Sequence, residues 1–407
     1  MFALYRALAA GFFLVTVAAL IGPPGDLGAQ DKKKDVKKDD PAKKSEMKKE
    51  DPKKIADAKD TQDRGVGFGT SDGLSLKGYW FQGAAIEKRR PDAVIMFPTP
   101  GNKITDAWID LARELSKNNF SVLLFDWRGC GLNGTEAGSR IMENREQFWR
   151  DPYNDFAFPR ETRKTVEERG LDWKTLRSKV DARGNSYKDF LLNDLMGARF
   201  FLDKQNDAGK CNTNRVWIVS EKDGAGLALG FIAAEFQRNS VYDPKDNPWD
   251  RGRQFKPAGR DYCGIMALSP AANGTGSMVY RNSFSGGGDW IKEAREHLER
   301  RLAMAFAYSK KEGAANARSL ISSVNALGTE DQMKRDFKYL REVDVKGKDI
   351  NGISMIDPMD SFGARDLITK AMVEISKVQP FNKDPTDRDA AKMTNVPRFM
   401  IERFNRK

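Results

Sequence analysis

Histidine and cysteine are scarce in this sequence, which has one and three of them in 407 residues, and their scarcity removes several kinds of chemistry. His297 stands in a charged stretch of helical character, which favours a solvated surface position over catalysis. The cysteines, Cys130, Cys211 and Cys263, lack the spacing of metal-binding motifs and are too few for a disulfide scaffold. We therefore expect no metal and no cofactor, and three free, mostly buried thiols. A bond between Cys211 and Cys263 in an oxidising compartment is the second interpretation.

A hydrophobic run marks the N-terminus. Residues 7–22 are almost wholly apolar, follow a single arginine, and precede small residues that end at Ala29. This pattern predicts a signal peptide over residues 1–29, and therefore a protein exported to the periplasm, the cell envelope or the extracellular space. An N-terminal membrane anchor that stays uncleaved is the second interpretation.

Residues 30–64 alternate lysine clusters with aspartate and glutamate and contain almost nothing to bury, which predicts a disordered tether. The formal net charge of the chain is +11. Because carboxylates interleave with the lysines, we expect at most a weak contact between the tether and an anionic envelope surface, and no nucleic-acid partner. Nothing in the sequence indicates an oligomeric state.

Apolar runs and helical patterns alternate from Val66 onward. Strands are predicted as a hairpin over 66–81 and at 93–97, 120–125, 215–219, 264–268, 302–308 and 352–356, and helices at 107–117, 191–202, 224–236, 314–324 and 364–378. Continuous apolar strands are typical of a parallel sheet covered on both faces. We predict an α/β domain over 65–380, with a mostly parallel eight-stranded sheet and helices on both faces, and a tail over 381–407. A charged insertion over 135–188 follows a strand end, as a lid or as a packing elaboration.

Four segments, taken in order, resemble the α/β-hydrolase superfamily. They are the opening hairpin over 68–78, the loop Phe97-Pro-Thr-Pro-Gly-Asn102, the turn Asp126-Trp-Arg-Gly-Cys-Gly-Leu-Asn-Gly134 after the fourth strand, and the helix Asp194-Leu-Met-Gly-Ala-Arg-Phe-Phe-Leu202. The resemblance covers about residues 66–380. It implies an α/β-hydrolase-like fold, with a nucleophile on a sharp strand–turn–helix segment.

That segment has neither a serine nor a cysteine at the nucleophile's place. The positions that match Gly-x-Ser-x-Gly run from Glu221 to Ala225, so the resemblance assigns the place to Asp223. A carboxylate can act as a nucleophile, as it does in the related haloalkane dehalogenases and epoxide hydrolases. However, the bulky, charged Glu221 stands where a glycine is expected. We favour the interpretation that Asp223 caps the helix that begins near Gly224.

The resemblance also implies places for the acid, the base and the oxyanion donors. Glu312 matches the acid, and Asp360 or Ser361 stands where the histidine is expected. The backbone around Thr99, Gly101 and Gly224 corresponds to the oxyanion region.

Without an imidazole, the usual carrier of the proton near neutral pH is missing. Our first hypothesis is an exported α/β-hydrolase-fold protein that lacks standard Ser-His-Asp catalysis and binds a small-molecule ligand or acts in the envelope. The alternative is an active hydrolase of the ester, carbon–halogen or epoxide type, with Asp223 as nucleophile.

Overall fold

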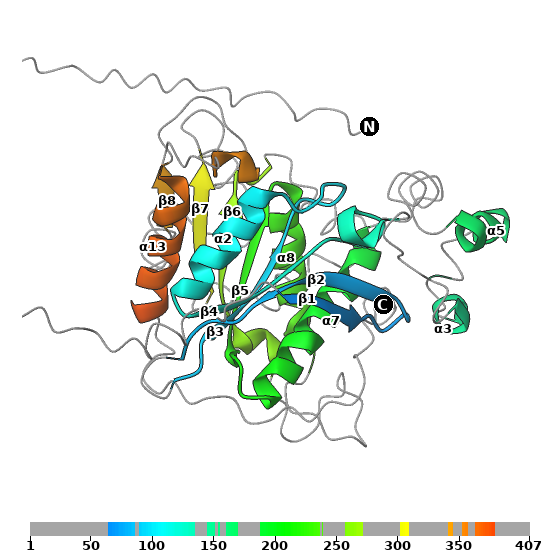
Figure 1. The fold of residues 1–407 in the computed structure, drawn as a ribbon, viewed down its shortest axis with the longest axis horizontal. Helices are drawn as coiled ribbons and strands as arrows, with labels where there is room; N and C mark the ends of the chain where they lie inside the picture. Colours follow the sequence, from blue (N-terminus) through cyan, green and yellow to red (C-terminus); the bar gives the residue numbers. More distant parts are fainter. Residues whose placement is uncertain are drawn as a thin grey trace, which may run out of the picture. The chain divides into compact units, whose positions relative to one another are not determined.

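The computed structural model describes residues 64–85, 89–134, 145–150, 154, 160–169, 188–236, 238, 257–271, 302–308, 341–344, 352–356 and 363–378 (Figure 1). The predicted signal peptide, the tether up to residue 63, the C-terminal tail and most of the insertion lie outside these residues. The predicted helix over 314–324 lies outside them too.

Eight strands and several helices make up the described part. The strands are β1 (Arg64–Gly69), β2 (Ser75–Phe81), β3 (Asp92–Phe97), β4 (Phe120–Phe125), β5 (Asn212–Glu221), β6 (Tyr262–Leu268), β7 (Ala303–Tyr308) and β8 (Arg341–Asp344). The α-helices are α2 (Asp106–Lys117), α3 (Arg145–Arg150), α5 (Arg160–Arg169), α7 (Lys188–Asp207), α8 (Asp223–Glu235) and α13 (Ala364–Val378). Short 3-10 helices are η2 (Gly131–Asn133), η4 (Ala258–Asp261) and η6 (Gly352–Met355).

The strands form one sheet in the order β1-β2-β4-β3-β5-β6-β7-β8. β2 runs antiparallel to β1 and β4, and the pairs from β4 through to β8 are parallel. This arrangement confirms the predicted α/β-hydrolase-like fold with a mostly parallel eight-stranded sheet. The chain leaves β3 toward β4 on one side and returns to β5 on the other, so the loops after β3 and β5 lie side by side. Open α/β sheets bind their ligands at such a switch point.

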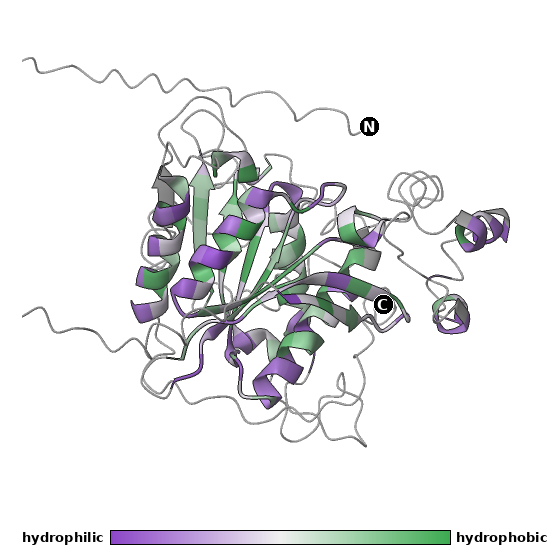
Figure 2. Ribbon diagram, viewed as in Figure 1, coloured by the Kyte–Doolittle hydropathy of each residue, from purple (hydrophilic) through white to green (hydrophobic). Residues whose placement is uncertain are grey.

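Alternating side chains divide the core into two layers. Ile95 of β3 and Ile218 of β5 pack with α7 and α8, whereas Val94 and Trp217 pack on the opposite face with α2 and α13. Figure 2 shows hydrophobic strands between helices that carry hydrophilic patches. Because helices cover both faces of the sheet, the side chains on both faces of a strand are buried, and the strand sequences are continuous apolar runs.

The eighth strand is not where the sequence placed it. The apolar run Gly352–Ile356 forms η6 with a following turn, and the last strand is the charged segment Arg341–Asp344, which pairs with β7 at the sheet edge. Met355 and Ile356 are buried in the layer of α2 and α13. A short apolar run has the same signature in a strand and in a buried turn, so its periodicity does not distinguish the two.

The three cysteines are free and buried, as favoured from the sequence. Burial raises the pKa of the Cys130 thiol to about 12, and it raises the pKa of Cys211 and Cys263 as well. These thiols are therefore poor nucleophiles. Within the described ranges, no helix combines the length and the hydrophobicity needed to cross a bilayer.

Candidate functional site

The turn between β5 and α8 carries a strained lysine. Lys222 has φ 46° and ψ −119°, a backbone conformation that L-residues rarely adopt, and its N–H donates to the Leu268 carbonyl of β6 at 3.0 Å. A strained residue between a strand and a helix is the position that hydrolases of this fold give to their nucleophile. The structure therefore places Lys222, and not Asp223, at that position.

Asp223 is the first residue of α8. The prediction that its side chain caps this helix is therefore wrong. Lys222 occupies the N-cap position, and no side-chain hydrogen bond caps the helix. Asp223 still lies in the first turn, where a negative charge is favoured by the helix dipole. The next residue, Gly224, packs closely against β3 and β5. A Cβ at this position would lie 3.2 Å from the Phe97 ring and 3.3 Å from Ser220 Cβ. The oxyanion role expected of the Gly224 backbone stays a prediction.

Glu221, the last residue of β5, is buried and joins two loops through its carboxylate. Its Oε1 accepts hydrogen bonds from the Thr99 backbone N–H at 3.2 Å and from Asn102 Nδ2 at 3.4 Å. Its Oε2 accepts one from the Ile353 backbone N–H at 2.8 Å. The Thr99 hydroxyl also donates to the Glu221 carbonyl at 3.1 Å. We call Glu221 with these three partner residues the Glu221 clamp.

The clamp has a direct consequence for the oxyanion region. Thr99 lies in the loop after β3, which supplies one of the two oxyanion donors in hydrolases of this fold. Its backbone N–H already donates to the Glu221 carboxylate. Gly101, with φ 97°, continues the same loop as a tight turn in which the Asn102 N–H donates to the Thr99 carbonyl at 3.0 Å. The Thr99 N–H of this loop is therefore occupied by a side chain of the protein itself, and the oxyanion role expected of Thr99 stays a prediction.

The remaining predicted site residues lie outside the described residues. Glu312 follows the end of β7 at Tyr308, and Asp360 and Ser361 follow the turn after η6. His297 also lies outside. Their assignment to the acid and base positions therefore stays a prediction.

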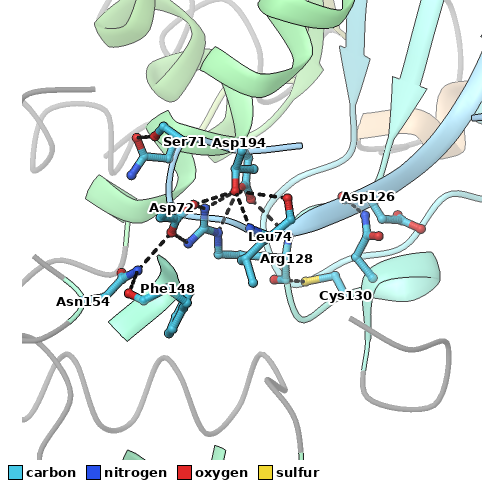
Figure 3. A network of polar contacts seen from close by, with 12 residues as sticks. Ser71, Asp72, Leu74, Asp126, Arg128, Cys130, Phe148, Asn154 and Asp194 are labelled. Carbon is cyan, nitrogen blue, oxygen red and sulfur yellow. Dashed lines mark hydrogen bonds and ion pairs between the residues drawn. The ribbon is translucent and has the colours of Figure 1, made fainter. Parts of the chain in front are cut away.

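A second polar site also lies near the carboxyl ends of the parallel strands. It is centred on Arg128, which follows β4 (Figure 3). Its guanidinium donates to Asp72 Oδ2 at 2.7 Å and, through Nε, to Asp194 Oδ1 at 2.7 Å. The Arg128 backbone N–H also donates to Asp194 Oδ2 at 3.1 Å. All three side chains are buried. We call them the Arg128 cluster; it joins the β1–β2 turn, the loop after β4 and helix α7.

The two carboxylates of the Arg128 cluster differ in their titration. Burial raises the pKa of Asp194 to about 6, and the positive charge of Arg128 only partly opposes this. Burial acts on Asp72 in the same direction. There, however, the charge of Arg128 and hydrogen bonds from Arg128, Thr70 and Asn154 outweigh it and hold the pKa below its usual value. When two carboxylates share one cation, the less well bonded one takes up the proton first.

The insertion is attached to the body through this cluster. Asn154 Nδ2 donates to Asp72 Oδ2 at 3.2 Å and to the Phe148 carbonyl at 3.0 Å. Gln147 Nε2 donates to the Ser71 carbonyl at 3.1 Å, and the Phe148 ring is buried in the layer of α7 and α8. For these described residues of the insertion, the packing interpretation is therefore the better supported one.

Asp126 organises the loop after β4 from within. Its Oδ1 accepts from the Ile104 N–H and its Oδ2 from the Leu132 N–H, both at 2.8 Å. Burial raises the pKa of Asp126 to about 6 even though these bonds favour the charged form. Among the side chains that the structure describes, no group of three or more metal-ligating residues forms a metal site.

Comparisons with known proteins find similar structures but no relatives in sequence. No protein-family model matches the chain, and no curated protein matches it either. Solved structures that resemble it include the Pyrococcus furiosus esterase Pf2001 (12% identity, 81% of this chain and 94% of that chain, TM-score 0.41) and the esterase Est22 (12% identity, 80% and 82%, TM-score 0.45). Another is Thermogutta terrifontis esterase 2 (10% identity, 77% and 94%, TM-score 0.43). The chain has an α/β-hydrolase-like fold, which rests on its own strand order and on the β5–α8 turn.

Proposed function

We propose that this is an exported protein that uses an α/β-hydrolase-like scaffold for binding or for an envelope-associated task, without Ser-His-Asp catalysis. The observation that carries the proposal is the occupancy of the β5–α8 turn. Lys222 stands at the strained position, and the Glu221 carboxylate accepts the Thr99 N–H that an acyl oxyanion would need. Fold alone does not decide function, so the side chains at this turn weigh more than the architecture.

Further support comes from what a hydrolytic cycle requires. An acyl intermediate is released by a water that a general base activates, and histidine is the usual base near neutral pH. The sequence contains one histidine, which precedes β7 instead of following the last strand. The alternative, an active hydrolase that uses Asp223 as nucleophile, loses support because Asp223 is the first residue of a helix and not the strained residue of the turn.

An assay of ester and haloalkane hydrolysis tests the proposal. We expect purified protein to give no sustained turnover of short-chain p-nitrophenyl esters or of haloalkanes, and we expect Asp223→Asn to behave like the parent. Sustained turnover that disappears in Asp223→Asn would establish the alternative. Export rests on the sequence pattern of residues 1–29, and sequencing the N-terminus of protein recovered outside the cytoplasm tests it.

A further inference from the structure

Lys222 is a nucleophilic side chain that the proposed function leaves without a task. Within the described residues no hydrogen bond or ion pair engages its amine, and the residue is half-buried at the carboxyl edge of the sheet. Its strained backbone, with φ 46°, persists only where the surrounding structure enforces it. The β5–α8 turn thus presents an amine where related folds present a hydroxyl.

Gly352 makes room for the lysine stem. A Cβ at this residue would lie 3.2 Å from Lys222 Cε and would also overlap the Glu221 carboxylate. Gly352 has φ +63°, a conformation that glycine adopts without strain. The stem of Lys222 therefore lies against the start of η6.

The carboxylate beside Lys222 in the sequence is already satisfied. Both oxygens of Glu221 accept hydrogen bonds from neutral donors, namely Thr99, Asn102 and Ile353. The hydrogen-bond donors of the Glu221 carboxylate therefore do not include the amine of Lys222, although the Lys222 stem lies close to it. Within the described residues, that amine makes no hydrogen bond or ion pair.

One oxyanion donor of the turn is still available. The first four N–H groups of a helix have no acceptor within the helix, and Asp223 and Gly224 open α8. In hydrolases of this fold, the N–H of the residue after the nucleophile is one of the two oxyanion donors. With Lys222 at the nucleophile position, that residue is Asp223. An acyl carbonyl next to the amine would keep one of the two donors.

We infer that Lys222 is an acyl acceptor, whose amine takes one acyl group from an activated ester or thioester and keeps it as an amide. The inference rests on the proposed function, because an acyl group is retained only by a chain that does not turn it over. The neutral amine attacks the carbonyl carbon, and a C–N bond forms. The bond from carbon to the leaving oxygen or sulfur breaks, the leaving group departs with the electron pair, and the nitrogen loses its proton to water.

Acetylation by p-nitrophenyl acetate tests the inference. The reaction is run on the whole protein at about pH 9, where a larger fraction of ordinary lysine amines is uncharged. We expect a fast phase that releases one nitrophenolate per chain, followed by slower release from exposed lysines, with the acetyl group of the fast phase located on Lys222 by peptide mapping. Because a single oxyanion donor is worth roughly 10²–10³ in rate, we expect labelling of Lys222 to be at least about tenfold faster than that of exposed lysines.

Two arginine variants are the matched controls. Lys222→Arg keeps the charge and the stem but removes the nucleophile, so the fast phase should vanish; thermal unfolding checks that this variant folds. Lys103→Arg removes an exposed lysine in the loop after β3 and should leave the fast phase unchanged.

The outcomes separate the inference from the proposed function. Uniform labelling of exposed lysines, or a fast phase that survives in Lys222→Arg, overturns the inference and leaves the proposed function in place. Continued nitrophenolate release that is lost in Asp223→Asn overturns the proposed function. A fast phase with Lys222 as the labelled residue supports both.

Discussion

The Arg128 cluster and the Glu221 clamp both lie near the carboxyl ends of the parallel strands, yet they stabilise buried carboxylates by different means. In the cluster, the guanidinium of Arg128 faces Asp72 and Asp194, so charge balances charge. In the clamp, two backbone N–H groups and one side-chain amide satisfy Glu221, and no cation takes part among its described partners. The cluster joins the β1–β2 turn, α7 and the insertion, whereas the clamp joins the loop after β3 to η6.

The two groups contact different parts of the molecule. The Arg128 cluster connects the β1–β2 turn, the loop after β4, α7 and the insertion, and none of its hydrogen bonds named above reaches the β5–α8 turn. The Glu221 clamp occupies the Thr99 N–H, which lies in the loop that supplies an oxyanion donor in hydrolases of this fold. The protein thus has the strand–turn–helix segment of an α/β-hydrolase-like fold, while the Glu221 carboxylate occupies a backbone N–H of the neighbouring loop after β3.

Removing Arg128 should have the largest effect. Arg128→Met leaves two buried carboxylates without their cation, and breaking a buried ion pair on one side costs about 3–5 kcal/mol. Denaturant unfolding measures the loss. The control is Arg113→Met on α2, whose side chain is 49% exposed in its pair with Asp110 and should change stability by about 0.5 kcal/mol or less. Similar losses in both variants would contradict a charge-balanced cluster.

Glu221→Gln should have an intermediate effect. The glutamine keeps one acceptor oxygen, but its NH₂ group then faces a partly buried N–H donor, of Thr99 or of Ile353, that loses its partner. An unsatisfied donor costs about 1–3 kcal/mol when it is fully buried, so at this partly buried site the free energy of unfolding should fall by about 1–2 kcal/mol. Glu146→Gln on α3, where the glutamate is 74% exposed beside Arg150, is the control and should be nearly neutral. An unchanged midpoint for Glu221→Gln would mean that the clamp contributes nothing.

The sequence predicted most of the fold because buried strands leave a clear pattern. β3, β4 and β6 are continuous apolar runs, and each lies between two neighbouring strands. β8 was missed for the opposite reason. Its segment Arg341–Asp344 is short and charged and pairs on one side alone, as edge strands do.

The site was less predictable, and its turn was misplaced by one residue. Gly224 and Gly226 made Asp223 resemble a nucleophile between small residues, and no rule of composition expects a lysine at positive φ. Glu221 was read as a misfit because its hydrogen-bond donors are remote in sequence, at Thr99, Asn102 and Ile353. Contacts across more than a hundred residues have no local signature. The sequence therefore indicated the strand–turn–helix segment but not which of its residues takes the strained backbone conformation.

The smallest expected effect separates strain at Lys222 from capping by Asp223. Lys222→Gly should relieve a strained backbone worth roughly 1–3 kcal/mol, less about 0.5–1 kcal/mol for the added freedom of glycine in the unfolded chain. We expect a net gain of about 1 kcal/mol, measured as a rise in the thermal midpoint. Asp223→Ala removes no side-chain cap, so it should lose only the dipole interaction of about 0.3–1 kcal/mol. A fall in stability for Lys222→Gly, together with a loss near 2 kcal/mol for Asp223→Ala, would restore Asp223 as the helix cap and remove Lys222 from the strained position.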